Sequence, residues 1–292
     1  MLRVVLPKGS LEKATLELFA AADLAVRRSS DVDYRAVIDD PRVADVRILR
    51  PQEIPVYVAD GLFDLGITGR DWIEERAASV LSLGELAYSK ATANPIRVVL
   101  AVADTSPFKT LADLAGHKVR VSTEYPGLTE RALAEHGVDA EISLSYGATE
   151  AKVPDIADCV VEITETGRAL RAAGLRVIDT LLVSRTELIA NPAAAGDPQK
   201  RHAMEQLLTL LQGTLEARDK VLVKLNVPPD RLDAVVGVLP SMRAPTVSEL
   251  SGGRGFALET VVLKREINTL IPALKDQGAT DILELALAKI VH

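Results

Sequence analysis

The stretch that decides the fold runs Asp158-Cys-Val-Val-Glu-Ile-Thr-Glu-Thr-Gly-Arg-Ala-Leu170. Its first half has the apolar composition of a buried strand, and residues 164–167 turn the chain at once into the start of a helix. The same order of strand, turn and helix follows three earlier segments, at residues 2–6, 46–49 and 63–67. This repeated order predicts an α/β fold with substantial parallel pairing in its sheets.

The repeated order occurs in two runs. The second run begins with the apolar segment 96–103 and ends with an expected strand at 176–179, after which residues 181–189 lead back to the first run. We therefore expect two α/β lobes, one formed by residues 1–92 with 183–212 and the other by residues 93–182. Two lobes joined by two crossing segments leave a cleft that can close on a ligand.

The last 80 residues have a different pattern. A long helix is expected at about 200–218, and residues 213–292 then read β-α-β-β-α-β, the ferredoxin-like order. The expected elements are strands 221–226, 246–250, 256–263 and 282–287 and helices 230–238 and 265–277. The tail is therefore expected to be a separate α+β domain.

Composition excludes several classes of protein. The chain has 48% hydrophobic and 26% charged residues, the balance of a soluble globular protein. It carries 34 Lys and Arg against 41 Asp and Glu, a net charge of −7, whereas a nucleic-acid binder normally has a basic excess. No apolar run approaches the ~18 residues of a membrane span, and the N-terminus enters a strand directly, unlike a signal peptide. We expect a cytoplasmic protein with no nucleic-acid or membrane partner.

Cysteine and histidine usage argues against a disulfide and against a built-in metal site. Cys159 is the single cysteine, so an intramolecular disulfide is impossible. The four histidines show no spacing typical of metal ligands. No Ser-His-Asp or Cys-His set can be placed either, so positioning and electrostatics are the expected means of catalysis.

The turn at 164–167 has the features of an anion site. The first N–H groups of a helix point outward, and the helix dipole favours negative charge. Gly167 lets a ligand approach the backbone, Thr164 and Thr166 add hydroxyl donors, and Glu162 could accept hydrogen bonds from ribose hydroxyls. The alternative is an ordinary helix capped by Thr166.

Other polar residues follow expected strands. Lys8 stands beside a glycine turn, and Arg50 at a strand end suits bidentate phosphate binding, although a salt bridge would also explain it. Asp64 and Asp71 could bind hydroxyls or orient a metal's water shell, or else cap helices and turns. Tyr125 could stack on a base or simply pack in the core.

These segments occur together in one known family. Lys8-Gly9, Arg50–Pro55, Asp64–Gly69, Glu162–Gly167 and residues 239–248 follow one another in an order that resembles ATP phosphoribosyltransferase, the first enzyme of histidine biosynthesis. The tail resembles that of the long form; the short form requires a separate partner protein instead. The resemblance implies a two-lobed catalytic part like type II periplasmic binding proteins, with a C-terminal ferredoxin-like (ACT-like) regulatory domain.

The resemblance also implies a reaction. The family joins N1 of the adenine of ATP to C1 of phosphoribosyl pyrophosphate and releases pyrophosphate, with Mg²⁺ accompanying the substrate phosphates. The implied catalytic residues are Glu162 at the ribose hydroxyls, with Lys8 and Arg50 on the facing lobe. The implied substrate-binding residues are Glu150, Thr164, Glu165, Thr166, Gly167, Arg168, Ala169, Asp71 and Tyr125.

Within this set, residues 164–169 would cradle the 5′-phosphate, and Glu150 would line the same pocket. Asp71 would lie near ATP and the pyrophosphate. The chain departs from the family pattern at two positions: many members have arginine in place of Ser10 and threonine in place of Ala169. The second change removes one hydroxyl donor, but backbone N–H groups still bind phosphate without it.

For the tail, the resemblance implies feedback inhibition by histidine, bound between ACT-like domains of neighbouring subunits in a hexamer. Asn226, Met242 and Thr246 match family positions in that effector site. Asn226 stands where an acid is often found, so the effector's charged groups would be recognised differently. The alternative is a tail that only assembles the oligomer.

Three other functions fit part of the sequence. A non-catalytic two-lobed protein that binds small anions would have the same lobes, but neither the tail nor the missing signal peptide suits it. A different phosphoribosyltransferase class typically has two adjacent acids before its phosphate loop, and Val161-Glu162 supplies one. Hydroxymethylbilane synthase shares the two lobes but needs a cysteine for its cofactor, and Cys159 lies within an apolar strand.

Overall fold

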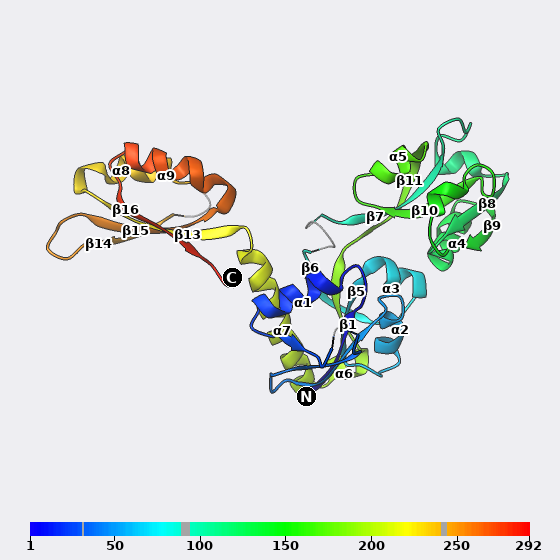
Figure 1. The fold of residues 1–292 in the computed structure, drawn as a ribbon, viewed down its shortest axis with the longest axis horizontal. Coiled ribbons are helices and arrows are strands. Elements are labelled where there is room, and N and C mark those ends of the chain that lie inside the picture. The colour runs from blue at the N-terminus through cyan, green and yellow to red at the C-terminus, as the bar shows by residue number, and fades with distance from the viewer. Residues whose placement is uncertain (31, 89–93, 241–243) are drawn as a thin grey trace. The chain divides into compact units, whose positions relative to one another are not determined.

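The computed structural model describes residues 1–30, 32–88, 94–240 and 244–292. The chain divides into two compact units, Met1–Leu208 and Thr209–His292. The first unit holds a seven-stranded and a five-stranded sheet, and the second unit holds a four-stranded sheet (Figure 1). The boundary between the units falls within the long helix α7 (Pro198–Ala217).

The seven-stranded sheet forms the first lobe. Its strands, in spatial order, are β2 (Val26–Arg27), β3 (Arg35–Ile38), β4 (Val43–Leu49), β1 (Leu2–Pro7), β5 (Leu65–Gly69), β12 (Thr186–Ala190) and β6 (Leu81–Leu86). The central strand β1 pairs in parallel with β4 and β5, as the strand–turn–helix order predicts. Its residues are almost all buried, because helices cover the faces of a parallel sheet.

The described residues of this lobe form the helices α1 (Glu12–Ala21), α2 (Ile54–Ala59), α3 (Arg70–Arg76) and α6 (Pro192–Gly196), and α7 begins in the same unit. The helices α2 and α3 follow β4 and β5 directly, so residues 50–53 and 70–71 lie at the carboxyl edge of the sheet. The helix α1 follows β1 through Lys8–Leu11 in the same way. The sequence therefore places the turns after three neighbouring strands at a single edge.

The five-stranded sheet forms the second lobe. Its spatial order is β11 (Leu175–Ser184), β7 (Ile96–Ala103), β10 (Cys159–Thr164), β8 (Lys118–Thr123) and β9 (Asp139–Leu144). The strand β8 pairs in parallel with β9 and β10, and β7 pairs antiparallel with β10 and β11. Its helical elements are α4 (Pro126–Glu135), α5 (Arg168–Ala172) and the 3₁₀ turns η1 (Leu111–Leu114) and η2 (Thr149–Lys152).

The return from the second lobe differs from the expectation. A strand at 176–179 followed by a segment at 181–189 was expected, but β11 continues to Ser184 and β12 begins at Thr186. The longer strand forms because β7 offers it backbone partners along its whole length, as far as the pair Ser184–Ile96. One residue, Arg185, therefore separates the two sheets at this crossing.

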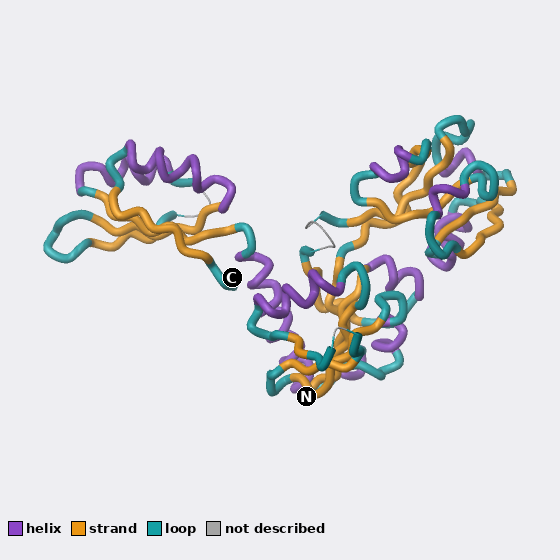
Figure 2. The backbone as a smooth tube through the Cα atoms, viewed as in Figure 1, coloured by secondary structure: helices purple, strands orange, loops and turns teal. Residues whose placement is uncertain are grey.

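The second unit has the ferredoxin-like order expected from the tail. Its strands lie in the order β14 (Thr246–Glu249), β15 (Phe256–Leu263), β13 (Lys220–Val227), β16 (Thr280–Ala286), and all neighbours are antiparallel. Alternate residues of β13 are buried against the helices α8 (Leu232–Val238) and α9 (Ile267–Asp276), which Figure 2 shows on one face of this sheet. The 3₁₀ turns η3 (Pro229–Arg231) and η4 (Lys264–Glu266) precede these helices.

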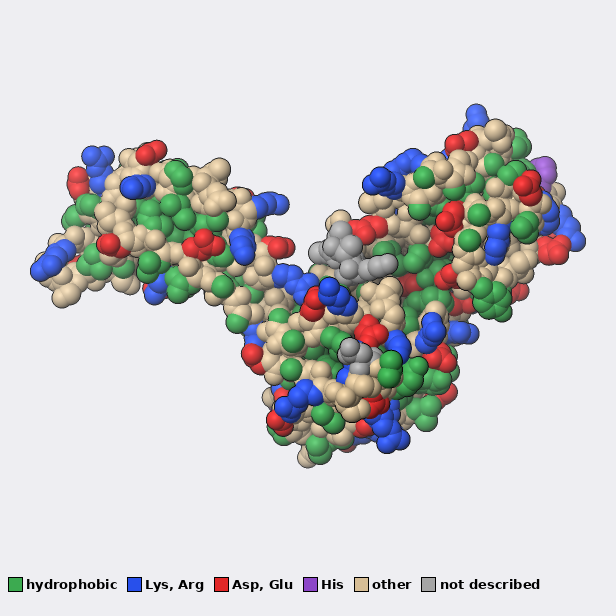
Figure 3. All heavy atoms as spheres, viewed as in Figure 1, with side chains coloured by type: hydrophobic (Ala, Val, Ile, Leu, Met, Phe, Trp, Pro, Cys, Tyr) green, Lys and Arg blue, Asp and Glu red, His purple; other side chains and the backbone are tan. Residues whose placement is uncertain are grey.

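Surface charge and hydropathy add two observations. Lys and Arg side chains are interspersed with Asp and Glu over the face drawn in Figure 3, so the charge lies in small groups of both signs. Among the described residues, no helix is long and apolar enough to cross a membrane.

Candidate functional site

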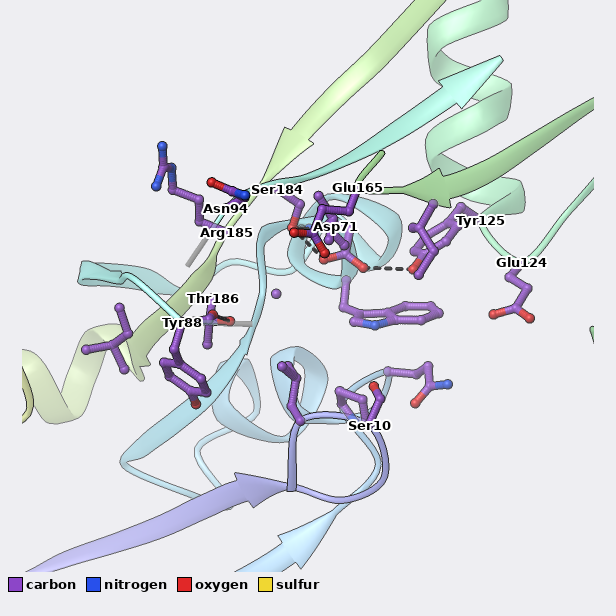
Figure 4. A pocket seen from close by; sticks show the side chains of 18 of the residues that line it. Ser10, Asp71, Tyr88, Asn94, Glu124, Tyr125, Glu165, Ser184, Arg185 and Thr186 are labelled. Atoms are coloured by element: carbon purple, nitrogen blue, oxygen red, sulfur yellow. Dashed lines mark hydrogen bonds between the residues drawn. The ribbon is translucent and has the colours of Figure 1, made fainter. Parts of the chain in front are cut away.

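A cavity of about 370 Å³ lies where the two lobes of the first unit meet (Figure 4). The first lobe lines it with the turn after β1, the start of α3 and the end of β6. The second lobe lines it with Glu124 and Tyr125 after β8 and with Ile163 and Glu165 at the end of β10. Residues 184–186 of the crossing segment close one side. The turns that follow several strands therefore meet in one space.

Asp71 is the buried acid of this cavity. Ser184 Oγ donates a hydrogen bond to Asp71 Oδ1 at 2.6 Å, and Tyr125 Oη donates to Oδ2 at 2.8 Å (Figure 4). Burial raises the pKa of Asp71, while these two hydroxyl groups act in the opposite direction. Gly69 makes the fold-back possible, because a Cβ at that position would collide with Asp71 Oδ1. Each carboxylate oxygen accepts one of these hydrogen bonds and retains capacity for a further one.

Tyr125 lies almost fully buried beside the cavity, and its ring packs on Trp72 with centroids 4.5 Å apart and planes 31° apart. Burial and the Asp71 charge raise the pKa of Tyr125, so its hydroxyl remains a donor. Both aromatic residues line the cavity. Trp72 is half-buried and offers a π-face of the kind that binds a flat base, whereas Tyr125 is 1% exposed and packs against it. Trp72 was not singled out from the sequence, although it is the only tryptophan and directly follows Asp71.

In the turn after β10, the helix α5 is capped by Gly167 without a side-chain hydrogen bond, so the alternative of a Thr166 cap is wrong and the anion site stays a prediction. Thr164 Oγ1 accepts a hydrogen bond from Gly167 N at 2.8 Å, and Thr166 Oγ1 accepts a longer one from Arg168 N at 3.4 Å. Gly167 has a φ of +73°, which a side chain would strain. The helix that follows begins at Arg168, and Ala169 in its first turn is exposed. The hydroxyls therefore shape the turn itself. Gly167 is buried, and Arg168 and Ala169 are exposed.

Glu162 is half-buried on β10 just before this turn. Burial raises the pKa of its carboxyl; a hydrogen bond from the Thr149 side chain lowers it, and the charges of Glu124 and Glu150 raise it again. The charges of Glu124 and Glu150 therefore both act on Glu162, at one edge of the second sheet. Among the described residues, however, no group of three or more His, Cys, Asp and Glu could hold a metal ion.

Lys8 and Arg50 lie next to each other at the carboxyl edge of the first sheet. Their strands are paired as far as Pro7 and Leu49, and Lys8 N donates to Leu49 O at 2.7 Å. The Lys8 ammonium lies 4.1 Å from the centre of the Tyr34 ring, a cation–π contact that the sequence did not indicate. Arg50 is exposed at the end of β4. Neither side chain lines the cavity.

Asp64 lies at the opposite edge of the sheet from Asp71. The prediction that it binds hydroxyls or orients a metal's water shell at the carboxyl edge is therefore wrong. The strand β5 is Leu65–Gly69, so Asp64 lies at the amino end of the strand and Asp71 lies beyond its carboxyl end. Asp64 is buried and accepts hydrogen bonds from Arg3 N at 2.8 Å and Lys200 Nζ at 2.9 Å. It is a structural ion-pair partner.

In the second unit, Asn226 and Thr246 lie on one face of the sheet. Their cross-strand partners on β15 are Ala257 and Glu259, which are two residues apart and therefore point to the same side. Asn226 Nδ2 donates to Asp281 Oδ2 at 3.0 Å. The third expected effector residue, Met242, lies outside the described residues.

The fold and the cavity define a class of protein. Two α/β lobes joined by two crossing segments, with a ligand-sized cavity between them and a ferredoxin-like unit after them, make a two-lobed type II periplasmic-binding-protein-like architecture with an added α+β domain. A family model described as ATP phosphoribosyltransferase matches residues 50–213, and one described as HisG, C-terminal domain, matches residues 217–289. The chain belongs to the ATP phosphoribosyltransferase family.

Curated relatives match the whole chain. It is 47% identical over 292 residues to the ATP phosphoribosyltransferase of Pelotomaculum thermopropionicum and 46% identical to that of Desulforudis audaxviator, in each case with 99% of both chains covered. Among solved structures, the chain resembles one from the ATP phosphoribosyl transferase (HisG:HisZ) complex of Thermotoga maritima, with a TM-score of 0.62 and 26% identity. That match covers 74% of this chain and 99% of the other, which therefore has no counterpart to about a quarter of this one.

Proposed function

We propose that this enzyme transfers the phosphoribosyl group of phosphoribosyl pyrophosphate to N1 of ATP in the cavity between its two lobes, releasing pyrophosphate. This reaction is the first step of histidine biosynthesis. The observation that carries the proposal is the cavity itself, which is lined from one side by the turn after β10 and from the other by the turns after β1 and β5. Because the chain belongs to an enzyme family and has such a cavity, the alternative of a non-catalytic anion-binding protein is not favoured.

The residues suit a reaction without a protein nucleophile. Adenine N1 is itself a nucleophile, and pyrophosphate leaves readily once its charge is neutralised. Burial raises the pKa of Cys159 to about 12, so the only thiol in the chain stays protonated and unreactive at neutral pH. Catalysis then rests on holding two substrates in line and stabilising the positive charge that develops on the ribose.

Each side of the cavity has a part in this scheme. Glu165 lines the cavity, and the turn around it, residues 164–169, receives the 5′-phosphate through backbone N–H groups and the Arg168 side chain. Glu162, which with Glu150 lies outside the cavity lining, accepts hydrogen bonds from the ribose hydroxyls. The ring of Trp72, which is half-buried and has Tyr125 packed against it, receives the adenine, because both residues line the cavity.

On the first lobe, Lys8 and Arg50 attract the phosphates of ATP and the pyrophosphate. Their adjacency at one sheet edge supports this role, since two neighbouring cations at strand ends form a polyanion site. Asp71 holds the turn after β5 in place through Ser184 and Tyr125, and its carboxylate oxygens can still accept a hydrogen bond from the substrate.

Mg²⁺ fits this site as an ion that arrives with the phosphates. No cage of three acidic, histidine or cysteine side chains exists among the described residues, but Glu124, Glu150 and Glu162 lie close enough to influence one another's charge. When bound to pyrophosphate, Mg²⁺ would supply charge neutralisation of the leaving group. The −7 net charge is then compatible with two polyanionic substrates.

The tail is the proposed regulatory part. Histidine would bind at the sheet face that carries Asn226 and Thr246, and the chains would assemble into a hexamer in the cytoplasm. The Thermotoga maritima chain is solved in a complex with HisZ and lacks a counterpart to about a quarter of this chain. Here the tail would take over the regulatory role within the same polypeptide.

The test is conversion of the two substrates by the purified full chain. With ATP, phosphoribosyl pyrophosphate and Mg²⁺, mass spectrometry should show phosphoribosyl-ATP, with one pyrophosphate released for each ATP consumed. A folded protein that binds both substrates but forms no such product would overturn the proposed function.

A further inference from the structure

Gln52 brings an amide group with an unpaired oxygen to the wall of the cavity. It lies in the turn between β4 and α2, two residues after Arg50, and it lines the cavity together with Pro51 and Trp72. Its Oε1 atom is buried and has no hydrogen-bond partner among the described residues. A buried amide oxygen without a partner destabilises the folded chain, so a ligand that supplies a donor there gains affinity.

The backbone around Gln52 is held from two sides. Thr68 Oγ1 donates a hydrogen bond to Pro51 O at 3.0 Å, and Arg76 Nε donates one to Gln52 O at 3.1 Å. The ring of Pro51 also fixes its own φ angle. The turn is therefore anchored, and the torsions of the Gln52 side chain are what remains free to adjust to a ligand.

The anchor of this turn lies on the same helix face as Trp72. Trp72 and Arg76 are four positions apart in α3, so their side chains lie on one face of that helix. Arg76 reaches the carbonyl of Gln52, so the turn lies along this face. A base that stacks on Trp72 therefore shares the cavity with the Gln52 amide, on the same side of α3.

Adenine has one edge that suits this amide. In the proposed reaction N1 must face C1 of phosphoribosyl pyrophosphate, so N1 is not available to the protein. The neighbouring edge presents the N6 amino donor and the N7 acceptor, which a glutamine matches with its oxygen and its NH₂ group. Guanine presents two acceptors there, O6 and N7, so the amide oxygen would face an acceptor.

We propose that Gln52 is a specificity-determining residue that binds the N6/N7 edge of the adenine of ATP and leaves N1 free to react. The inference rests on the proposed function, because it assumes that the adenine stacks on Trp72. The two ends of an amide are similar in size, so a half-turn about the last side-chain bond brings the oxygen to the cavity without new space. The N6 amino group then pairs the unpaired oxygen, and the NH₂ group donates to N7.

The test compares three ligands that differ only at this edge. They are ATP, purine riboside 5′-triphosphate, which lacks the N6 amino group, and 7-deaza-ATP, which lacks N7. Isothermal titration of the full chain with Mg²⁺ gives a Kd for each. The wild type should bind each analogue about tenfold more weakly than ATP, the loss expected for one hydrogen bond. Equal binding of all three ligands by the wild type would already overturn the proposal.

Two variants separate the two hydrogen bonds. Gln52→Leu removes both, so it should bind the three ligands with equal affinity. Gln52→Glu keeps an acceptor for N6 but has no donor for N7. It should still prefer ATP over purine riboside 5′-triphosphate and should lose its preference for ATP over 7-deaza-ATP. The added charge acts on every triphosphate alike, so it cancels in the ratios of Kd values.

Gln199→Leu is the matched control. Gln199 is exposed on α7 and does not line the cavity, so this variant should keep the wild-type ratios. Wild-type ratios in Gln52→Leu, from an enzyme that still forms phosphoribosyl-ATP, would overturn the role of Gln52 and leave the proposed function standing. A wild type that binds the ligands but forms no phosphoribosyl-ATP would instead overturn the proposed function, and this inference with it.

Discussion

Asp64 and Asp71 stand seven positions apart, and their surroundings give their carboxylates opposite properties. Asp64 receives a backbone N–H and two cationic side chains, so the pKa of its carboxyl is lowered although burial alone would raise it. Asp71 receives two neutral hydroxyls, and burial raises its pKa. The five residues of β5 between them decide which edge of the sheet each acid reaches. From the sequence alone, either carboxylate could bind hydroxyls or orient a metal's water shell.

The Asp64 pair gives a pH prediction. Because its pKa is lower in the folded chain, Asp64 stabilises the fold above its unfolded pKa of about 3.9, and the stabilisation is lost as the pH falls through the folded value. Asp64→Asn should lower the free energy of unfolding by about 2 kcal/mol at pH 7. Denaturant melts should show this difference shrinking below about pH 4. Asp60→Asn, an exposed acid nearby, is the control, and an unchanged melt for Asp64→Asn would contradict the assignment.

Arg50 gives a prediction for catalysis. Its guanidinium is exposed at a strand end, so its removal should leave the fold intact while weakening phosphate binding. Arg50→Ala should reduce kcat/KM by about 100-fold or more, the range for a charged contact to phosphate. Arg27→Ala, which removes a surface arginine paired with Asp39 on the same lobe, should stay near wild type. Equal kcat/KM values for the two variants would contradict the role of Arg50 in phosphate binding.

At the scale of elements, α3 of the first lobe and α4 of the second are joined directly. Glu75 Oε1 and Oε2 accept hydrogen bonds from Gly127 N at 3.1 Å and Leu128 N at 2.9 Å, so a carboxylate from α3 caps the start of α4. Arg131 of α4 also donates to Glu74 O. This contact joins the two lobes through helix residues in addition to the crossing segments.

The close approach makes Gly127 a sensitive position. A Cβ there would lie 2.8 Å from Glu75 O, which is backbone and cannot move aside easily. Gly127→Ala should therefore cost about 1–3 kcal/mol of stability, as overpacking does. Gly196→Ala, in a helix with open space around it, should be neutral or slightly stabilising. Thermal melts of the two variants decide the matter, and a neutral Gly127→Ala would contradict the lobe contact.

Elements that form from neighbouring residues can be predicted from the sequence, and features that depend on distant partners cannot. The strand–turn–helix units around Lys8, Arg50 and Glu162 were predictable because each forms from neighbouring residues. The length of β11 was not, because its partner β7 lies far away in the chain. The partners of Asp71 were also missed, since Ser184 is 113 residues away and has no local pattern to mark it.

At the scale of the molecule, the order of units was readable from the switch between a parallel α/β pattern and the β-α-β-β-α-β tail. What the sequence could not place was the cavity, which depends on how both lobes fold around their crossings. The place of Trp72 in the site emerges only there. The family resemblance implies roles for individual residues, and the structure shows which side chains lie next to those residues.

The proposed regulation by histidine is tested on the whole chain. Millimolar L-histidine should inhibit the wild type and release heat on binding, and light scattering should report a hexamer. Thr246→Val should weaken inhibition while basal activity persists, because Thr246 lies on the second unit. Thr269→Val, on α9 of the same unit, is the control. If histidine neither releases heat on binding nor inhibits the wild type, the tail only assembles the oligomer.

The most direct test of the central claim is a crystal structure of the full chain with phosphoribosyl pyrophosphate and Mg²⁺. The 5′-phosphate should lie on the backbone of residues 164–169, with the ribose hydroxyls within hydrogen-bond distance of Glu162. Phosphoribosyl pyrophosphate bound elsewhere, with the turn after β10 empty and Glu162 away from the sugar, would contradict the account.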